Sequence, residues 1–146
     1  ANLDIKVWCS RSNHDFGHLA TVEIDFINQI SAHEIIETWQ SFSSEVFDHR
    51  LPSSSNVINF VDGKLDPVKH RWVGSEPKFP DKYLSAGMPV SVAEIEVSDK
   101  KLIFKLLSDN TIRGAAGYGV LLAELLLVDE IIQDNNLINI SSNQSN

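Results

Sequence analysis

The chain has 146 residues, of which 42% are hydrophobic and 22% are charged, and its formal net charge at pH 7 is −8. This length and composition indicate one globular domain that can bury a sizeable core. The negative charge argues against a nucleic-acid partner, because phosphates require a basic surface.

Other features of the composition favour a cytoplasmic protein with no membrane contact. Cys9 is the single cysteine, so no disulfide can form within the chain. The N-terminus lacks the pattern of a signal peptide. The longest apolar stretch, Val120 to Val128, is interrupted by Glu124 and is too short to span a membrane.

The first half of the chain predicts strands and one helix. Apolar and polar residues alternate from Asp4 to Ser10 and again from Ala20 to Phe26, as in half-buried strands. Ser31 to Phe42 has a capping box and an apolar stripe at helical spacing, which predicts an amphipathic helix. Val57 to Val61 is a candidate short strand.

The second half begins with an expected surface excursion from Gly63 to Gly87, which carries Trp72, Phe79 and Tyr83. Val90 to Val97 and Lys101 to Leu107 then predict a hairpin that turns at residues 98–100. A final helix is expected from about Thr111 to Asp134. Because this helix is apolar nearly all round, we expect it to be buried.

The order of these elements indicates an α+β fold with a mostly antiparallel sheet covered by helices. Residues 1–134 are expected to form the domain, and the Asn- and Ser-rich residues 135–146 a frayed polar tail.

The loop after the first strand holds candidate chemistry. An arginine, Arg11, can bind a carboxylate through both arms of its guanidinium, and a histidine, His18, beside a glycine can act as a general base. The alternative is an ordinary solvated loop. His14 and His18 have helical spacing but no evident third ligand, so no metal site is expected. The alternation of the first strand places Cys9 on its apolar face, which favours a buried structural thiol.

The last helix begins with three glycines, Gly114, Gly117 and Gly119, although glycine lowers helix stability by roughly 1 kcal/mol relative to alanine. Close helix packing explains such residues. The alternative is ligand binding by free backbone N–H groups at the helix start, with Asn110 beside them. The spacing does not fit the Gly-x-Gly-x-x-Gly motif of dinucleotide-binding folds.

Four stretches resemble, in the same order, the C-terminal half of aspartate-semialdehyde dehydrogenases, particularly the archaeal and fungal branch. "CSRSNHDFGH" resembles the family's Cys-x-Arg followed by Gly-His. "LPSSS" and "GMPVSVAEI" resemble Leu-Pro-Ser-Ala-Pro and Gly-Met-x-Val-Ser-Val-Gly. "DNTIRGAAGYGVLLAEL" is similar to the family's Asn-Thr-Ile/Val-x-Gly-Ala-Ala-Gly helix and is the most specific of these motifs.

The resemblance implies a catalytic and dimerisation domain like the C-terminal domain of glyceraldehyde-3-phosphate dehydrogenase. In the family, NADPH-dependent reduction of aspartyl phosphate, a step in amino-acid biosynthesis, passes through a thioester on a cysteine. By this resemblance His18 would be the general acid/base and Arg11 would hold the substrate carboxylate. Asn110 and Gly114 would face the NADP cofactor. A homodimer or homotetramer that binds a small-molecule substrate is expected.

The sequence also departs from the family pattern. The family's nucleotide-binding domain and nucleophilic cysteine precede the matching region, so we expect the chain alone to be inactive. Ser12-Asn13-His14 replaces the usual Val-Pro-Val, and residues 65–80 lack Arg-Pro-Gln-Pro-Arg. Two alternatives therefore stay open: a related acyl-CoA or acyl-phosphate semialdehyde reductase, and a non-catalytic dimerisation module.

Overall fold

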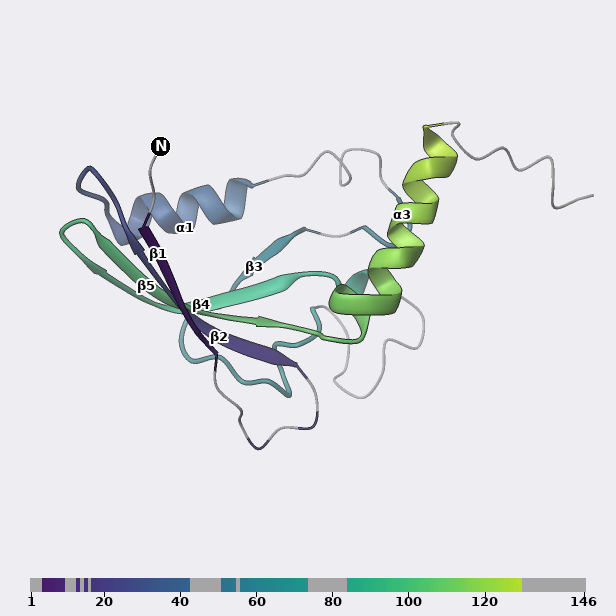
Figure 1. Cartoon of the computed structure of the whole chain (residues 1–146), viewed down its shortest axis with the longest axis horizontal. Helices are drawn as coiled ribbons and strands as arrows, with labels where there is room; N and C mark the ends of the chain where they lie inside the picture. Colours follow the sequence, from purple (N-terminus) through teal and green to yellow (C-terminus); the bar gives the residue numbers. More distant parts are fainter. Residues whose placement is uncertain are drawn as a thin grey trace, which may run out of the picture.

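A five-stranded sheet of order β1-β2-β5-β4-β3 forms the centre of the protein (Figure 1). The computed structural model describes residues 4–9, 13, 15, 17–42, 51–54, 56–73 and 84–129. The strands are β1 (Asp4–Cys9), β2 (His18–Asp25), β3 (Ile58–Phe60), β4 (Val90–Ser98) and β5 (Lys101–Ser108). Neighbouring strands are antiparallel except β3 and β4, which are parallel. The expected α+β fold with a mostly antiparallel sheet is confirmed.

Helix α1 (Ala32–Ser41) covers one face of the sheet. Its predicted capping box is present, because the Ser31 hydroxyl accepts the Glu34 N–H at 3.2 Å and the Glu34 carboxylate accepts the Ser31 N–H at 2.9 Å. The Ser31 hydroxyl also donates to the Glu34 carboxylate at 2.7 Å, and this bond, together with the one from the Ser31 N–H, lowers the pKa of that carboxyl group. The Trp39 ring meets the Phe104 ring edge-on, with centroids 4.9 Å apart. The main core, built around Val22, Val92, Leu102 and Phe104, lies beneath this helix.

The opposite face of the sheet carries ion pairs around β1, β2 and β5. The Glu23 carboxylate lies 3.5 Å from the Lys6 ammonium and 2.5 Å from the Lys101 ammonium. The hydrogen bond between Lys101 and Glu23 lowers the pKa of the carboxyl group and raises the pKa of the amine. Trp8 of β1 stands exposed on this charged face.

The expectation that the apolar face of β1 is buried is wrong for Ile5 and Val7, which are both exposed. The physical reason is that β1 is an edge strand and α1 packs over β3 and β4 instead. The side chain of Cys9 lies outside the described residues, so its burial stays a prediction.

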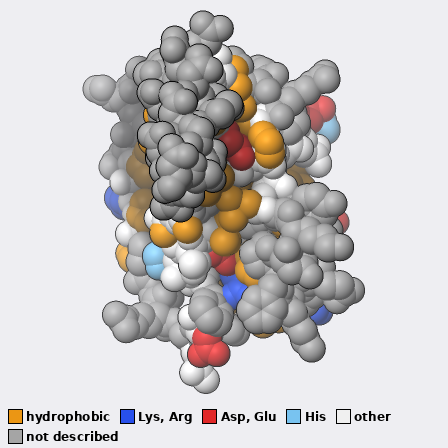
Figure 2. All heavy atoms as spheres, turned by 90° about the vertical axis from the view of Figure 1, so that its right-hand side faces the viewer, with side chains coloured by type: hydrophobic (Ala, Val, Ile, Leu, Met, Phe, Trp, Pro, Cys, Tyr) orange, Lys and Arg blue, Asp and Glu red, His pale blue; other side chains and the backbone are white. Residues whose placement is uncertain are grey.

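The last helix begins with a π-helical turn, η2 (Ile112–Ala116), and continues as α3 (Gly117–Val128) beyond the end of β5 (Figure 1). The prediction that it is buried is wrong. Gly117 and Leu121 are its buried residues, whereas Tyr118 is 55% exposed and Val128 is 50% exposed. Figure 2, which looks at the side of the molecule where α3 stands, shows hydrophobic side chains at the surface. Residues 130–134 and the expected frayed tail at 135–146 lie outside the described residues.

The predicted surface excursion is partly internal. Leu65 and Trp72 are buried, and the segment ends in a short 3-10 helix, η1 (Leu84–Gly87), whose Ala86 is also buried. Phe79 and Tyr83 lie outside the described residues. Among the helices described, none has both the length and the apolar character to cross a membrane.

Candidate functional site

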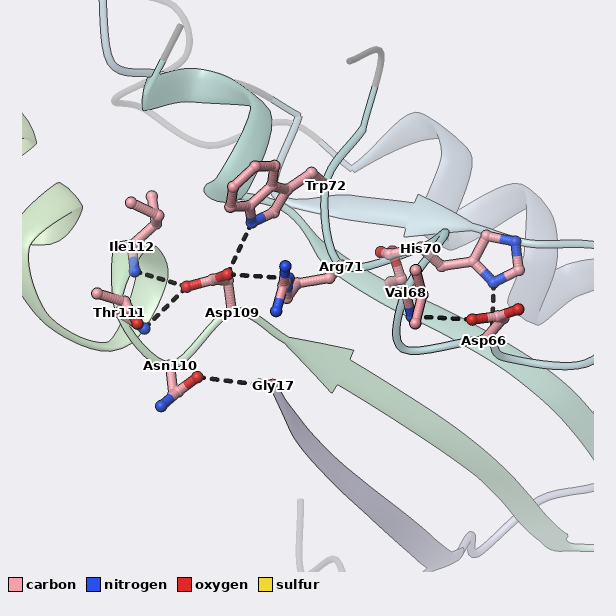
Figure 3. Close-up of polar contacts among 11 residues, drawn as sticks. Gly17, Asp66, Val68, His70, Arg71, Trp72, Asp109, Asn110, Thr111 and Ile112 are labelled. Carbon is pink, nitrogen blue, oxygen red and sulfur yellow. Dashed lines mark hydrogen bonds and ion pairs between the residues drawn. The ribbon is translucent and has the colours of Figure 1, made fainter. Parts of the chain in front are cut away.

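The start of β2 and the end of β5 form a corner that joins two of the predicted site regions. His18 opens β2 opposite Ser108, the last residue of β5, and Asn110 follows closely. The Gly17 N–H donates to Oδ1 of Asn110 at 2.9 Å (Figure 3). Gly17 has a φ of 97°, a conformation that L-residues rarely adopt. The structure therefore brings the Gly17–His18 segment and Asn110 together.

The bond to Gly17 determines what Asn110 can offer a ligand. Because its Oδ1 accepts a backbone N–H, its amide nitrogen points the other way and can only donate. This nitrogen makes no hydrogen bond within the described residues. A ligand group that meets Asn110 must therefore be an acceptor, such as a carbonyl oxygen.

A buried carboxylate next to Asn110 organises the surrounding chain. Asp109 is 2% exposed, and its Oδ1 accepts the N–H groups of Thr111 and Ile112, each at 2.8 Å. Its Oδ2 accepts the Trp72 indole N–H at 2.7 Å and lies 3.4 Å from Nε of Arg71 (Figure 3). Trp72 therefore belongs to the interior of this site and not to the surface segment that the sequence predicted.

Arg71 extends this network to the corner. Its guanidinium carbon lies 4.9 Å from the centre of the Trp72 ring, and its side chain is 14% exposed. Its Cδ lies 3.8 Å from the point where a Cβ of Gly17 would stand. Neither Arg71 nor Asp109 was predicted as a site residue. The detectable signal was an Asp directly before a predicted helix, a common capping residue.

The glycine-rich helix start is explained chiefly by packing. A Cβ at Gly117 would lie 2.7 Å from the carbonyl oxygen of Ile112 and 2.9 Å from Sδ of Met88. A Cβ at Gly87 would lie 2.9 Å from the Ile112 side chain. These contacts confirm the close packing expected at Gly117.

Gly114 differs from this packing glycine. It is exposed, and a Cβ there would meet its nearest neighbour, the carbonyl oxygen of Asp109, at an ordinary 3.8 Å. The expectation of tight packing is wrong at this position, whose surface remains open to a ligand.

The backbone N–H groups at this helix start are largely used within the protein. Those of Thr111 and Ile112 bind the Asp109 carboxylate, and that of Gly114 binds the Asp109 carbonyl oxygen at 3.1 Å. These three N–H groups are therefore not available to a ligand, and ligand binding by the rest of the helix start stays a prediction. Any ligand here meets the Asn110 amide and the open surface of Gly114 instead.

The segment that resembles Leu-Pro-Ser-Ala-Pro is anchored to α3. Glu124 accepts the Ser53 backbone N–H at 3.0 Å and the Ser53 hydroxyl at 2.9 Å. Leu51 packs with Met88 and Leu121 in a buried cluster beside the helix. The interruption of the apolar run by Glu124 thus serves a contact between distant segments.

Of the predicted pair Arg11 and His18, the structure describes only His18. His18 is exposed at the start of β2, where a ligand can reach it. Arg11 and His14 lie outside the described residues, so their roles stay predictions. Within the described part of the chain, no group of three His, Cys, Asp or Glu side chains is arranged to hold a metal.

No protein-family model matches the sequence, although several individual proteins resemble it. An aspartate-semialdehyde dehydrogenase of Archaeoglobus fulgidus is 28% identical over 133 residues, which cover 90% of this chain and 35% of that protein. A crystal structure of aspartate semialdehyde dehydrogenase II from Vibrio cholerae shares the fold, with a TM-score of 0.52, 19% identity and coverage of 78% of this chain and 28% of that one. The chain is thus similar in sequence to part of an aspartate-semialdehyde dehydrogenase, and it shares the fold of part of another.

The chain is similar in sequence to a second kind of enzyme as well. The malonyl CoA reductase (NADP) of Metallosphaera sedula is 31% identical over 115 residues, which cover 76% of this chain and 30% of that enzyme. The chain thus spans about a third of the length of the curated relatives it matches. The curated relatives that match this chain are dehydrogenases and a reductase by name, and the solved structure that matches it shares its fold.

Proposed function

We propose that this chain is the substrate-binding and dimerisation domain, corresponding to the C-terminal part, of an NADP-dependent aspartate-semialdehyde dehydrogenase. The observation that carries the proposal is the sequence likeness to these enzymes over most of the chain. The reaction would be the reduction of aspartyl phosphate to aspartate semialdehyde, with release of phosphate.

The corner between β2 and β5 supports this function chemically. His18 is exposed at the strand start, so its imidazole can exchange a proton with a substrate held beside it. Arg11 would bind the substrate carboxylate through its guanidinium. The amide nitrogen of Asn110 would donate to a carbonyl oxygen, which orients the group that carries it.

Asn110 and the open surface at Gly114 fit the nicotinamide end of a cofactor. The carboxamide of such a ligand presents an acceptor to the Asn110 donor, and Gly114 has no side chain to obstruct a flat ring. NADPH supplies the hydride when it is bound. The nucleophilic cysteine of the family would come from outside this chain.

The exposed apolar residues of α3 support a larger assembly. Tyr118, Val120 and Leu122 near its start, with Leu127 and Val128 at its end, face away from the described core. Several exposed apolar side chains on one helix favour a contact with another domain or subunit. We infer that the cofactor-binding domain covers this helix in the complete enzyme.

We also infer that the sheet face opposite α1 mediates a homodimer or homotetramer. This face lacks a covering helix in the described structure and carries the exposed Trp8 beside the Lys6–Glu23 ion pair. Light scattering coupled to size-exclusion chromatography should show at least a dimer, and a strictly monomeric complete protein would argue against this interface.

The experiment is an assay of the full-length protein that carries this chain, with aspartyl phosphate and NADPH. Activity is expected there, and none from residues 1–146 alone. His18→Gln should lower kcat by about 10²–10⁴-fold, because general acid/base groups contribute that much. The matched control is His33→Gln on α1, which removes an exposed histidine paired with Glu37 and should leave kcat unchanged.

A second candidate is reduction of malonyl-CoA to malonate semialdehyde. It is favoured by the 31% identity to the Metallosphaera sedula enzyme. Arg11 does not discriminate, because both substrates carry a carboxylate. The ratio of kcat/KM for aspartyl phosphate and malonyl-CoA in the full-length protein decides between them, and activity with neither favours a non-catalytic dimerisation module.

A further inference from the structure

The Asp109 carboxylate uses its two oxygens for different purposes. Oδ1 accepts the backbone N–H groups of Thr111 and Ile112 and so fixes the short segment that contains Asn110. Oδ2 accepts the Trp72 indole N–H and lies beside Nε of Arg71. One buried side chain therefore links the segment after β5 to the segment that contains Arg71 and Trp72 (Figure 3).

Both of these segments contact Gly17, the residue before His18. Oδ1 of Asn110 accepts the Gly17 N–H, and Cδ of Arg71 lies 3.8 Å from the point where a Cβ of Gly17 would stand. Gly17 also packs on Leu107, whose Cδ1 would lie 3.1 Å from a Cβ at this position. The start of β2 is thus held between two residues whose own positions depend on Asp109.

A second aspartate shows what a local turn requires by itself. Asp66 accepts the N–H of Val68 at 2.8 Å and that of Lys69 at 3.3 Å, through Oδ1, at the same sequence offsets as Asp109. Its side chain is 42% exposed, and among the described residues its other oxygen meets the Lys69 ammonium alone, at 4.0 Å. Such a turn needs one acceptor oxygen, which Ser or Asn also provides. The contacts of Oδ2 in Asp109 therefore exceed what the turn needs.

We propose that Asp109 is a positioning residue for the Gly17–His18 corner. Through Oδ1 it sets the direction of the Asn110 side chain, and through Oδ2 it holds Trp72 and Arg71, of which Arg71 lies near Gly17. Only the assignment of His18 and Asn110 as ligand-contacting residues rests on the proposed function. The positioning itself can be measured on residues 1–146 without any substrate.

The test compares Asp109→Asn with Asp66→Asn by amide hydrogen exchange and by the indole N–H resonances of the tryptophans. Asp109→Asn keeps an acceptor for Thr111 and Ile112 but turns an amide N–H₂ toward the donors of Trp72 and Arg71. The Trp72 indole resonance should shift, whereas those of Trp8 and Trp39, which do not contact Asp109, should not. The Gly17 amide should exchange about tenfold faster while core amides such as that of Val22 stay protected, as expected for local opening. Asp66→Asn should change none of these signals.

A second variant, Asp109→Ser, keeps a hydroxyl acceptor for the turn, removes the second oxygen, and should give the same pattern. Equal acceleration at Gly17 and at Val22 would mean that Asp109 only stabilises the whole fold, and would overturn the proposal. An unchanged Gly17 amide in a folded variant would also overturn it, as would loss of the folded spectrum in both variants. In the full-length enzyme Asp109→Asn should lower kcat about tenfold with a smaller change in KM. Absence of dehydrogenase activity in the full-length protein would refute the proposed function. The positioning role of Asp109 would still be tested by the exchange of the Gly17 amide.

Discussion

Gly117 and Gly119 of α3 give opposite predictions for the same substitution. Both lie in the helix, where alanine is favoured over glycine by about 1 kcal/mol. Nothing lies within 4 Å of the point where a Cβ of Gly119 would stand. Gly119→Ala should therefore raise the free energy of unfolding by about 0.5–1 kcal/mol.

At Gly117 the added methyl group would enter occupied space. It would lie 2.7 Å from both the carbonyl oxygen and Cγ2 of Ile112, and 2.9 Å from Sδ of Met88, which is 1% exposed. Overpacking a core costs about 1–3 kcal/mol, and a backbone carbonyl that cannot move away places this case in the upper half of that range. After the gain in helix propensity of about 1 kcal/mol, Gly117→Ala should lower the free energy of unfolding by about 1–2 kcal/mol.

Urea unfolding of both variants, followed by circular dichroism at neutral pH, measures this difference directly. The midpoints should move in opposite directions from that of the parent chain, with similar slopes. The steric reasoning is refuted if Gly117→Ala proves as stable as Gly119→Ala. Gly114→Ala completes the series, because its Cβ fits and a loss of cofactor affinity in the full-length enzyme would then report on binding and not on folding.

Two further outcomes test the corner and the sheet. Gly17→Ala and Gly63→Ala both place a side chain at positive φ, which costs about 1–3 kcal/mol, but only Gly17 has close neighbours. Thermal unfolding should therefore show a larger loss for Gly17→Ala, and equal losses would contradict the packing of Leu107 and Arg71 on this residue. The pKa of Glu94 is lowered chiefly by its hydrogen bond from Lys105, below its ordinary value of 4.5. Its contribution to stability is complete above that value and is lost as the pH falls through the lowered pKa, so urea midpoints should drop between about pH 5 and about pH 3. Glu94→Gln should reduce that drop, and an unchanged pH dependence would count against the ion pair.

The elements whose hydrogen bonds close locally could be predicted from the sequence. The capping box of α1 needs only Ser31 and Glu34, three residues apart, and the β4–β5 hairpin needs only its alternating pattern and a short turn. The position of Asn110 between a strand and a helix could likewise be predicted, whereas its contact with a cofactor stays a prediction.

Contacts between distant segments could not be predicted in this way. The Trp72–Asp109 hydrogen bond joins residues 37 positions apart, and no local pattern marks Trp72 as internal. The exposure of α3 was also unpredictable, since an all-apolar helix indicates burial without saying what buries it. The parallel pairing of β3 with β4 joins two strands that are distant in the sequence, so no turn signal predicts it.

The π-helical turn η2 determines how α3 is rotated about its own axis. The N–H groups of Gly114 and Ala116 donate to the carbonyl oxygens of Asp109 and Thr111, five positions earlier, so this turn holds one residue more than an α-helical turn. Each residue rotates an α-helix by roughly 100°. Deleting one residue here would swing Leu121 and Leu125 away from Met88 and bring the outward apolar side chains inward. The length of this segment therefore determines which side chains of α3 pack on Met88 and which face outward. One residue in η2 thus fixes the direction in which the outer apolar side chains of the helix point relative to Asn110.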